Sequence, residues 1–202
     1  MSETTKVQTD PFVPPEPDFE LLCQAYGKLE TDPAAAVKIF ASLAERGSPQ
    51  SMLYLGACFR DGLGVEKILE TAEKWFRAAA DLGLVRAHYH LGRLYLDALR
   101  YAEAEQEFKS AASKGFVPAV HFLGRIHYYG YGVPVDRARA KVLLEEASNW
   151  GCVFAKALLA RDLRDETRGV SAFLKNTLLR LEPCFDAIKI LRTDGLASDR
   201  FL

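Results

Sequence analysis

Apolar residues recur along the chain at helical spacing, and one pattern of apolar, small and polar positions returns every 32 to 36 residues. Each unit has a glycine that ends a helix, a leucine eight residues later, and a small residue directly after that leucine. The glycines are Gly47, Gly83, Gly115 and Gly151, and the leucines are Leu55, Leu91, Leu123 and Leu159. A repeat of this length predicts helix pairs that bury their apolar faces against neighbouring pairs.

The second helix of each pair has an alanine eleven residues before the next glycine and a large apolar residue seven before it. These positions hold Ala36, Ala72, Ala104 and Ala140, then Phe40, Phe76, Phe108 and Leu144. The small residue after each leucine is Gly56, Gly92, Gly124 or Ala160. A glycine inside a helix lowers its stability by roughly 1 kcal/mol. Its return at three aligned positions therefore predicts that the backbone of the partner helix approaches closely there.

Two units carry a glycine loop between their helices, DGLGV at residues 61–65 and YGYGV at residues 129–133. We expect the first glycine to end a helix in the left-handed conformation and the second to let the chain reverse. Asp136 is placed to cap the next helix or to lead its first turn, whereas Ile68 stands at the equivalent position of the earlier loop. The unit at residues 83–114 has DALRY instead of a glycine loop.

The pattern divides the chain into four parts. The polar start contains four prolines, which predicts a flexible tail, and Asp18 is placed to cap the first helix after it. The parts are the tail at residues 1–17, a first helix pair at 18–47, the repeats at 48–182, and a capping helix with a loose end at 183–202. The predicted fold class is therefore all-α, a stack of antiparallel helix pairs.

Composition excludes several classes of function. The 202 residues are 49% hydrophobic and 26% charged, with a net charge of −1, so nothing global attracts nucleic acid or an anionic membrane. No apolar run approaches the ~18 residues of a membrane-spanning helix, and the polar start is no export signal, so we expect a cytoplasmic location. The cysteines are too scattered for a zinc site or a disulfide framework, so we expect reduced thiols and no cofactor: Cys23, Cys58, Cys152 and Cys184.

The sequence offers no catalytic motif. His88 and His90 are two residues apart on a predicted helix, so they point to different sides and cannot share a metal. His127 stands in a column otherwise held by Phe59 and Tyr95, which predicts a packing role. Neither H-E-x-x-H nor G-x-S-x-G occurs. We expect no enzymatic activity and keep a hydrolase only as a remote alternative.

The motifs resemble those of Sel1-like repeats, which are relatives of the tetratricopeptide repeat. The unit that shows this best reads LGACFRDGLGV followed by AEKWFRAAADLG, and the resemblance covers residues 34–181. It implies a right-handed superhelix of about four units plus capping helices. It also implies a concave inner surface, lined by the first helix of each pair, and a role as an adaptor or scaffold in protein contacts.

Three columns of these first helices are not needed for packing, and their offsets place them on one face. Guanidinium groups bind carboxylates through paired hydrogen bonds, and aromatic rings add contact area. We therefore predict that this face binds an acidic peptide or protein segment through Arg93, Arg125, Arg161, Arg60, Arg164, Tyr89, His121 and Tyr128. The alternative is that the arginines form only a solvated face.

A second hypothesis is self-assembly. The helices expected at residues 18–29 and 184–193 would then join two copies of the chain. The chain is accordingly expected to be a monomer or a homodimer that takes a protein partner.

Overall fold

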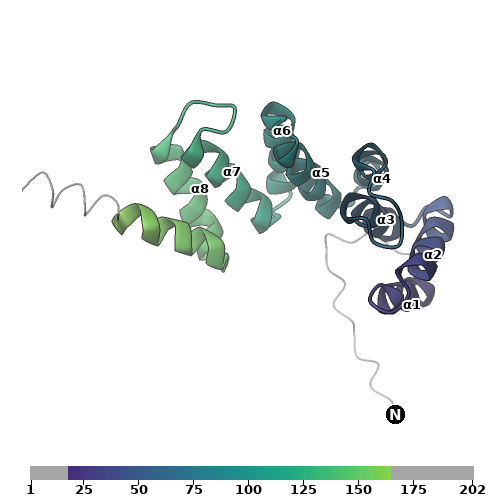
Figure 1. Cartoon of the computed structure of the whole chain (residues 1–202). Helices are drawn as coiled ribbons and strands as arrows, with labels where there is room; N and C mark the ends of the chain where they lie inside the picture. The colour runs from purple at the N-terminus through teal and green to yellow at the C-terminus, as the bar shows by residue number, and fades with distance from the viewer. Residues whose placement is uncertain (1–17, 165–202) are drawn as a thin grey trace, which may run out of the picture. The chain divides into compact units, whose positions relative to one another are not determined.

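The computed structural model describes residues 18–164 of the chain, and every regular element in this part is an α-helix (Figure 1). The helices are α1 (Phe19–Lys28), α2 (Pro33–Glu45), α3 (Pro49–Asp61), α4 (Leu69–Asp81), α5 (Val85–Asp97), α6 (Tyr101–Ser113), α7 (Val117–Tyr129) and α8 (Arg137–Asn149). A further helical stretch occupies residues 153–164. The predicted tail at 1–17 and capping helix at 184–193 lie outside the described residues.

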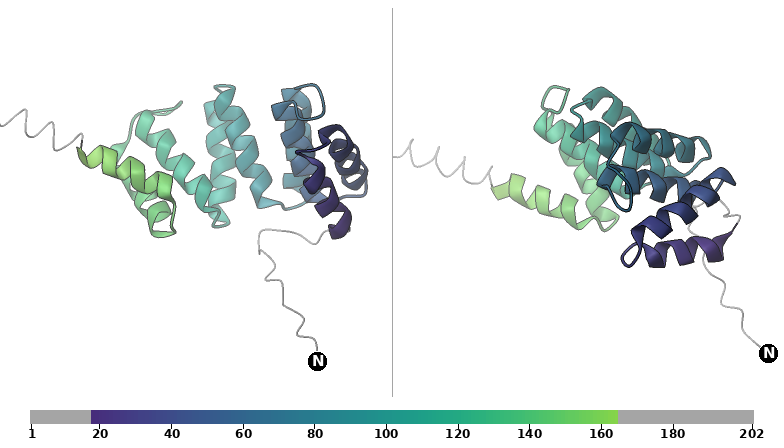
Figure 2. Two further views of the ribbon diagram at one scale, coloured as in Figure 1. Left: turned by 60° about the horizontal axis from the view of Figure 1, so that its bottom comes forward. Right: turned by 45° about the vertical axis from the view of Figure 1, so that its right-hand side comes forward.

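The described residues divide after Ala155 into two units, which are described separately. Within the first unit, the closest packing joins α3 to α4, α5 to α6, and α7 to α8. Successive pairs meet through α2 and α3, α4 and α5, and α6 and α7, as two further views show (Figure 2). This packing of one helix pair on the next is that of a helical solenoid, which confirms the predicted fold class.

Glycine ends the helices where the sequence predicts it. The four glycines that end α2, α4, α6 and α8 all have φ between 80° and 88°. In the loops, Gly62 and Gly130 are left-handed C-caps with φ of 76° and 73°. The unit without a glycine loop uses Leu99 instead, with φ of 59°. Because a residue with a side chain is strained in this conformation, Leu99 lowers the stability of the shortened unit.

The glycines inside the helices make room for large side chains of the partner helix. A Cβ built on Gly92 would lie 2.7 to 2.9 Å from three ring carbons of Phe108. The three facing pairs are Gly56 with Phe76, Gly92 with Phe108, and Gly124 with Leu144. Close contact at these glycines is confirmed, but the nearest atoms belong to side chains of the partner helix and not, as the sequence had predicted, to its backbone. One column of the repeat therefore fits into another.

The caps follow the sequence with one exception. Asp136 accepts a hydrogen bond from the backbone N–H of Arg139 at 2.9 Å, whereas Ile68 gives α4 no side-chain cap. Asp18 occupies the N-cap position of α1 but makes no cap hydrogen bond. Its carboxylate instead accepts from Nη1 of Arg46 at 3.0 Å, so it ties α1 to the end of α2. Asp18 therefore stands at the predicted N-cap position but does not supply a cap hydrogen bond from its side chain.

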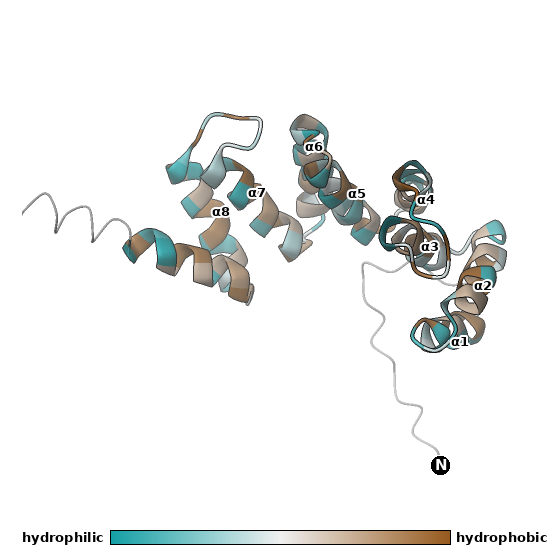
Figure 3. Cartoon of the chain, in the orientation of Figure 1, coloured by the Kyte–Doolittle hydropathy of each residue, from teal (hydrophilic) through white to brown (hydrophobic). Residues whose placement is uncertain are grey.

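The core consists of the repeated columns. The four aligned alanines and the three aligned phenylalanines are all 0% exposed, and Leu144 is 1% exposed. Figure 3 shows apolar and polar residues on every helix, as amphipathic packing requires. Within residues 18–164, no helix has both the length and the hydropathy to cross a bilayer.

Candidate functional site

Two arginines occupy the same position in successive units and rest on aromatic rings. The guanidinium carbon of Arg93 on α5 is 5.9 Å from the centre of the Tyr89 ring. That of Arg125 on α7 is 5.0 Å from the centre of the Phe122 ring. The two rings are themselves in contact, with centres 5.6 Å apart, so α5 and α7 present one continuous aromatic surface. We call Arg93 and Arg125, with Tyr89 and Phe122 beneath them, the arginine face.

The donors of the arginine face are not used by neighbouring acids. Within residues 18–164, neither Arg93 nor Arg125 forms an ion pair, whereas Arg77 and Arg100 both pair with Glu73. A guanidinium carries five N–H donors, and stacking on a ring leaves them available at its edge. The arrangement suits a carboxylate supplied from outside.

Arg60, at the end of α3, differs from these two. It donates two hydrogen bonds to Asp61, at 2.8 and 2.6 Å, and its Nη1 lies 3.2 Å from Nδ1 of His90. The hydrogen bond with Asp61 raises the pKa of Arg60 and lowers the pKa of the Asp61 carboxyl. Because its donors are already used, Arg60 is a structural residue beside the arginine face rather than an open binding group.

A cavity of about 230 Å³ lies between the end of α3, the first glycine loop and the end of α5. Lys67 and Arg93 face the same space, and both contribute to the lowered pKa of Asp61. The lining residues are Arg60, Asp61, Lys67, Leu69, Arg93, Leu94, Asp97 and Ala98. The cavity therefore extends the arginine face with a mixed-charge recess that has an apolar part.

His121 and Tyr128 were expected to face a partner, but the structure buries them, with 8% and 5% exposed. The His121 ring contacts Phe154, with centres 6.1 Å apart, and the guanidinium carbon of Arg137 lies 3.8 Å above the Tyr128 ring. Burial, and then the charge of Arg125, lower the pKa of His121 to about 4. Both side chains therefore pack in the interior and offer a partner protein little contact area.

Arg161 and Arg164 are exposed on the helical stretch at residues 153–164. Nε of Arg164 donates to the backbone oxygen of Ala160 at 3.2 Å. Both arginines belong to the second compact unit, so they are described apart from the arginine face.

A further column, which the sequence reasoning did not select, carries the contacts between units. It stands one position before each of the four aligned leucines and holds Tyr54, His90, Phe122 and Leu158. Each of its three rings stacks on a phenylalanine of the preceding helix, with centres 5.0 to 5.4 Å apart and planes within 26°: Phe40 with Tyr54, Phe76 with His90, and Phe108 with Phe122. A ring at three of four aligned positions was the signal that could have revealed it.

The histidines take packing roles. Nδ1 of His88 lies 2.8 Å from Oε2 of Glu107, whereas the His90 ring faces Arg60. The two histidine side chains therefore point to different sides of α5, as predicted. His127 is 6% exposed, in agreement with its predicted packing role. The part of the chain that the structure describes contains no group of three or more His, Cys, Asp or Glu residues placed to hold a metal.

Comparison with known proteins relates the chain to one repeat family. The sequence profile of the Sel1 repeat matches residues 21–48, 49–84 and 117–149. The unit that it passes over is the short one without a glycine loop.

A Sel1 repeat protein from Oxalobacter formigenes has a similar structure, with a TM-score of 0.64 and 28% sequence identity. The match covers 70% of the present chain and 61% of the Oxalobacter protein. A second similar structure is that of c5321, a protective antigen of uropathogenic Escherichia coli strains that displays an SLR fold. Its TM-score is 0.65 at 20% sequence identity, and the match covers 72% of the present chain and 34% of c5321. The chain thus spans less than two thirds of either protein. No curated protein sequence gives a significant match.

Proposed function

We propose that this chain binds an acidic segment of a partner protein over its arginine face. The chain belongs to the Sel1 repeat family. Members of this family generally act as protein interaction scaffolds and are typically non-catalytic. The observation that carries this proposal is the pair formed by Arg93 and Arg125. They repeat at one position of successive units, and within the described residues neither has a carboxylate partner.

The chemistry favours carboxylates over other ligands. A guanidinium that lies on an aromatic ring has lost part of its hydration, so a carboxylate gains more from pairing with it than with a fully solvated cation. The half-buried Tyr89 and Phe122 add apolar contact beside the charges. A segment that alternates acidic and apolar residues matches this surface. It would lie on the face that we expect to be concave.

The test is fluorescence anisotropy with a labelled peptide that alternates glutamate and alanine, beside a matched peptide in which glutamine replaces glutamate. We expect only the acidic peptide to bind. Each of Arg93→Glu and Arg125→Glu should weaken binding about tenfold or more, because an attractive charge pair becomes a repulsive one. The affinity should also fall as salt rises, since the contacts are partly solvated.

A control variant separates this site from a general effect of charge. Lys74 is exposed on α4, and within residues 18–164 it forms no ion pair. Lys74→Glu changes the net charge as much as Arg93→Glu does, so it should leave the affinity nearly unchanged. An equal loss in Lys74→Glu, or equal binding of the glutamine peptide, would contradict the proposal.

Self-assembly remains a second candidate, supported by exposed aromatic residues on the first helix. Phe19 and Tyr26 on α1 are 65% and 58% exposed, which is unusual for large apolar side chains. If α1 joins two copies, sedimentation should show a concentration-dependent dimer that Phe19→Ser disrupts. A monomer across the accessible concentrations would exclude this candidate and leave the binding proposal untouched.

A further inference from the structure

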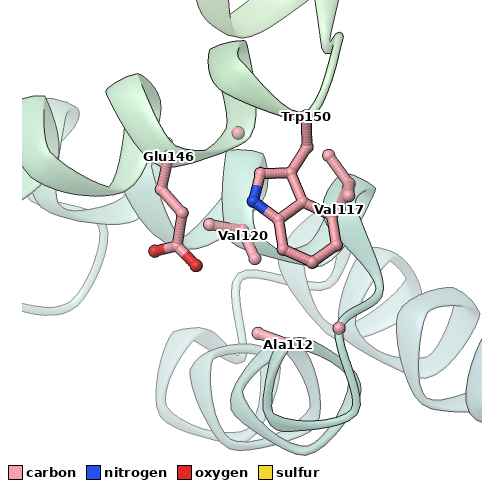
Figure 4. Close-up of a pocket in the computed structure, with 7 residues that line it drawn as sticks. Ala112, Val117, Val120, Glu146 and Trp150 are labelled. Carbon is pink, nitrogen blue, oxygen red and sulfur yellow. The ribbon is translucent and has the colours of Figure 1, made fainter.

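A small cavity lies where the ends of α6 and α8 meet the start of α7, and its lining shares no residue with the arginine face. Its volume is about 20 Å³, and Figure 4 shows Glu146 and Trp150 extending over Val120 from the end of α8. The lining residues are Ala112, Gly115, Val117, Val120, Glu146, Ala147 and Trp150. The floor is therefore apolar, one wall is an indole ring, and the rim carries one carboxylate.

The two groups that dominate this cavity have no charged or aromatic partner among the described residues. Trp150 is 65% exposed, although tryptophan is the side chain with most to gain from being covered. Among the described residues, Trp150 stacks on no other ring, and Glu146 forms no ion pair. Lys114, which precedes Gly115 at the cavity, is exposed and does not line it. An exposed indole beside a carboxylate that has no ion pair is a surface that can accept a cation from outside.

The chemistry of the missing group follows from these walls. The face of an indole ring attracts cations, the strongest such attraction among the aromatic side chains, and a carboxylate attracts them too. The cavity admits only about one group of the size of a water molecule, so it encloses the end of a side chain, and a compact ammonium head fits it better than a planar guanidinium. The methylene stem of such a side chain would lie outside the cavity, against the apolar residues and the indole ring at its edge. We propose that this cavity takes the ammonium end of a lysine side chain of a partner protein.

This lysine cavity is independent of the acidic segment proposed for the arginine face. It is built from α6, α7 and α8, and its charge is negative where that of the arginine face is positive. Either proposal holds if the other fails. A partner with both an acidic stretch and an exposed lysine would use the two sites together.

The test uses the indole N–H signals in a ¹H–¹⁵N NMR spectrum of the full chain. The chain has two tryptophans, so Trp75, a half-buried residue of α4, provides an internal reference. The probe is N-acetyl-lysine N-methylamide, titrated to about 100 mM at constant ionic strength, because one side-chain contact gives millimolar affinity. N-acetyl-norleucine N-methylamide is the matched apolar probe. Only the lysine probe should shift the Trp150 signal, and neither probe should shift that of Trp75.

Variants assign the contribution of the carboxylate. Glu146→Gln should weaken lysine binding about two- to fivefold, the range of a solvated ion pair. Glu145→Gln removes a neighbouring exposed carboxylate that does not line the cavity and should change nothing. The proposal is overturned if the norleucine probe binds as well, if Glu146→Gln binds as the parent does, or if the Trp150 signal does not move.

Discussion

Gly92→Ala tests whether the repeated glycine is a steric requirement of the stack. The new Cβ would lie 2.7 to 2.9 Å from three ring carbons of Phe108, where carbon atoms normally pack at roughly 3.5 to 4.0 Å. Phe108 is 0% exposed, and its ring stacks on Phe122 with centres 5.0 Å apart. The ring therefore cannot withdraw without disturbing the next unit.

The expected loss combines two opposing terms. Overpacking of a buried site costs about 1 to 3 kcal/mol. Replacing a glycine inside a helix by alanine gains about 1 kcal/mol. The net expectation is a fall of about 1 kcal/mol in the free energy of unfolding. Gly27 offers a matched control, because it lies in α1 with no atom within 4 Å of a built Cβ. Gly27→Ala should keep most of the helix gain without the steric cost.

The assay is urea unfolding of both variants, followed by far-UV circular dichroism. The difference between Gly92→Ala and Gly27→Ala isolates the steric term and should be about 1 to 3 kcal/mol. Adding Phe108→Leu to Gly92→Ala should recover part of the loss, since the clashing ring carbons are gone. If Gly92→Ala proves as stable as Gly27→Ala, packing does not require the repeated glycines, and this explanation of the stack is wrong.

Three further expectations concern caps, loops and pH. Asp136→Ala should lower the free energy of unfolding by about 1 kcal/mol, and Ile68→Asp should raise it by up to a similar amount, both by urea unfolding. Leu99→Gly should raise the melting temperature, because it relieves a strain of about 1 kcal/mol at a side chain that is 70% exposed. Burial chiefly lowers the pKa of His90 to about 4 from 6.5, so below 6.5 the unfolded chain binds more protons than the folded one. Stability should therefore fall between about pH 6.5 and pH 4 and stay flat above, and His90→Gln should reduce that slope.

The sequence predicts the stack well because every unit meets nearly the same neighbour. Gly92 faces Phe108 for the same reason that Gly56 faces Phe76, so aligned columns report on a contact that is repeated. The glycine-ended helices and the cap at Asp136 depend on local backbone geometry, which the residue type itself constrains. These features need no knowledge of distant parts of the chain.

The candidate site is predicted less well, because its side chains depend on what the next unit supplies. His121 aligns with the half-buried Tyr89, yet it is covered by Phe154, whose counterparts in the other units are not aromatic. Tyr128 is covered by Arg137 for a similar reason. A column shows which positions share a face of the helix. It does not show which of them a particular neighbour buries.

The aromatic contacts connect the stability of the stack to the proposed binding face. Phe108 fills the space left by Gly92 on one side and stacks on Phe122 on the other. Phe122 in turn carries Arg125, so a single ring joins the packing of one unit to the position of an arginine in the next. A partner that clamps Arg93 and Arg125 together would hold α5 and α7 in register, and the packing that stabilises the fold would already have set their spacing. Binding then requires little reordering of the backbone, which favours affinity because less conformational entropy is lost.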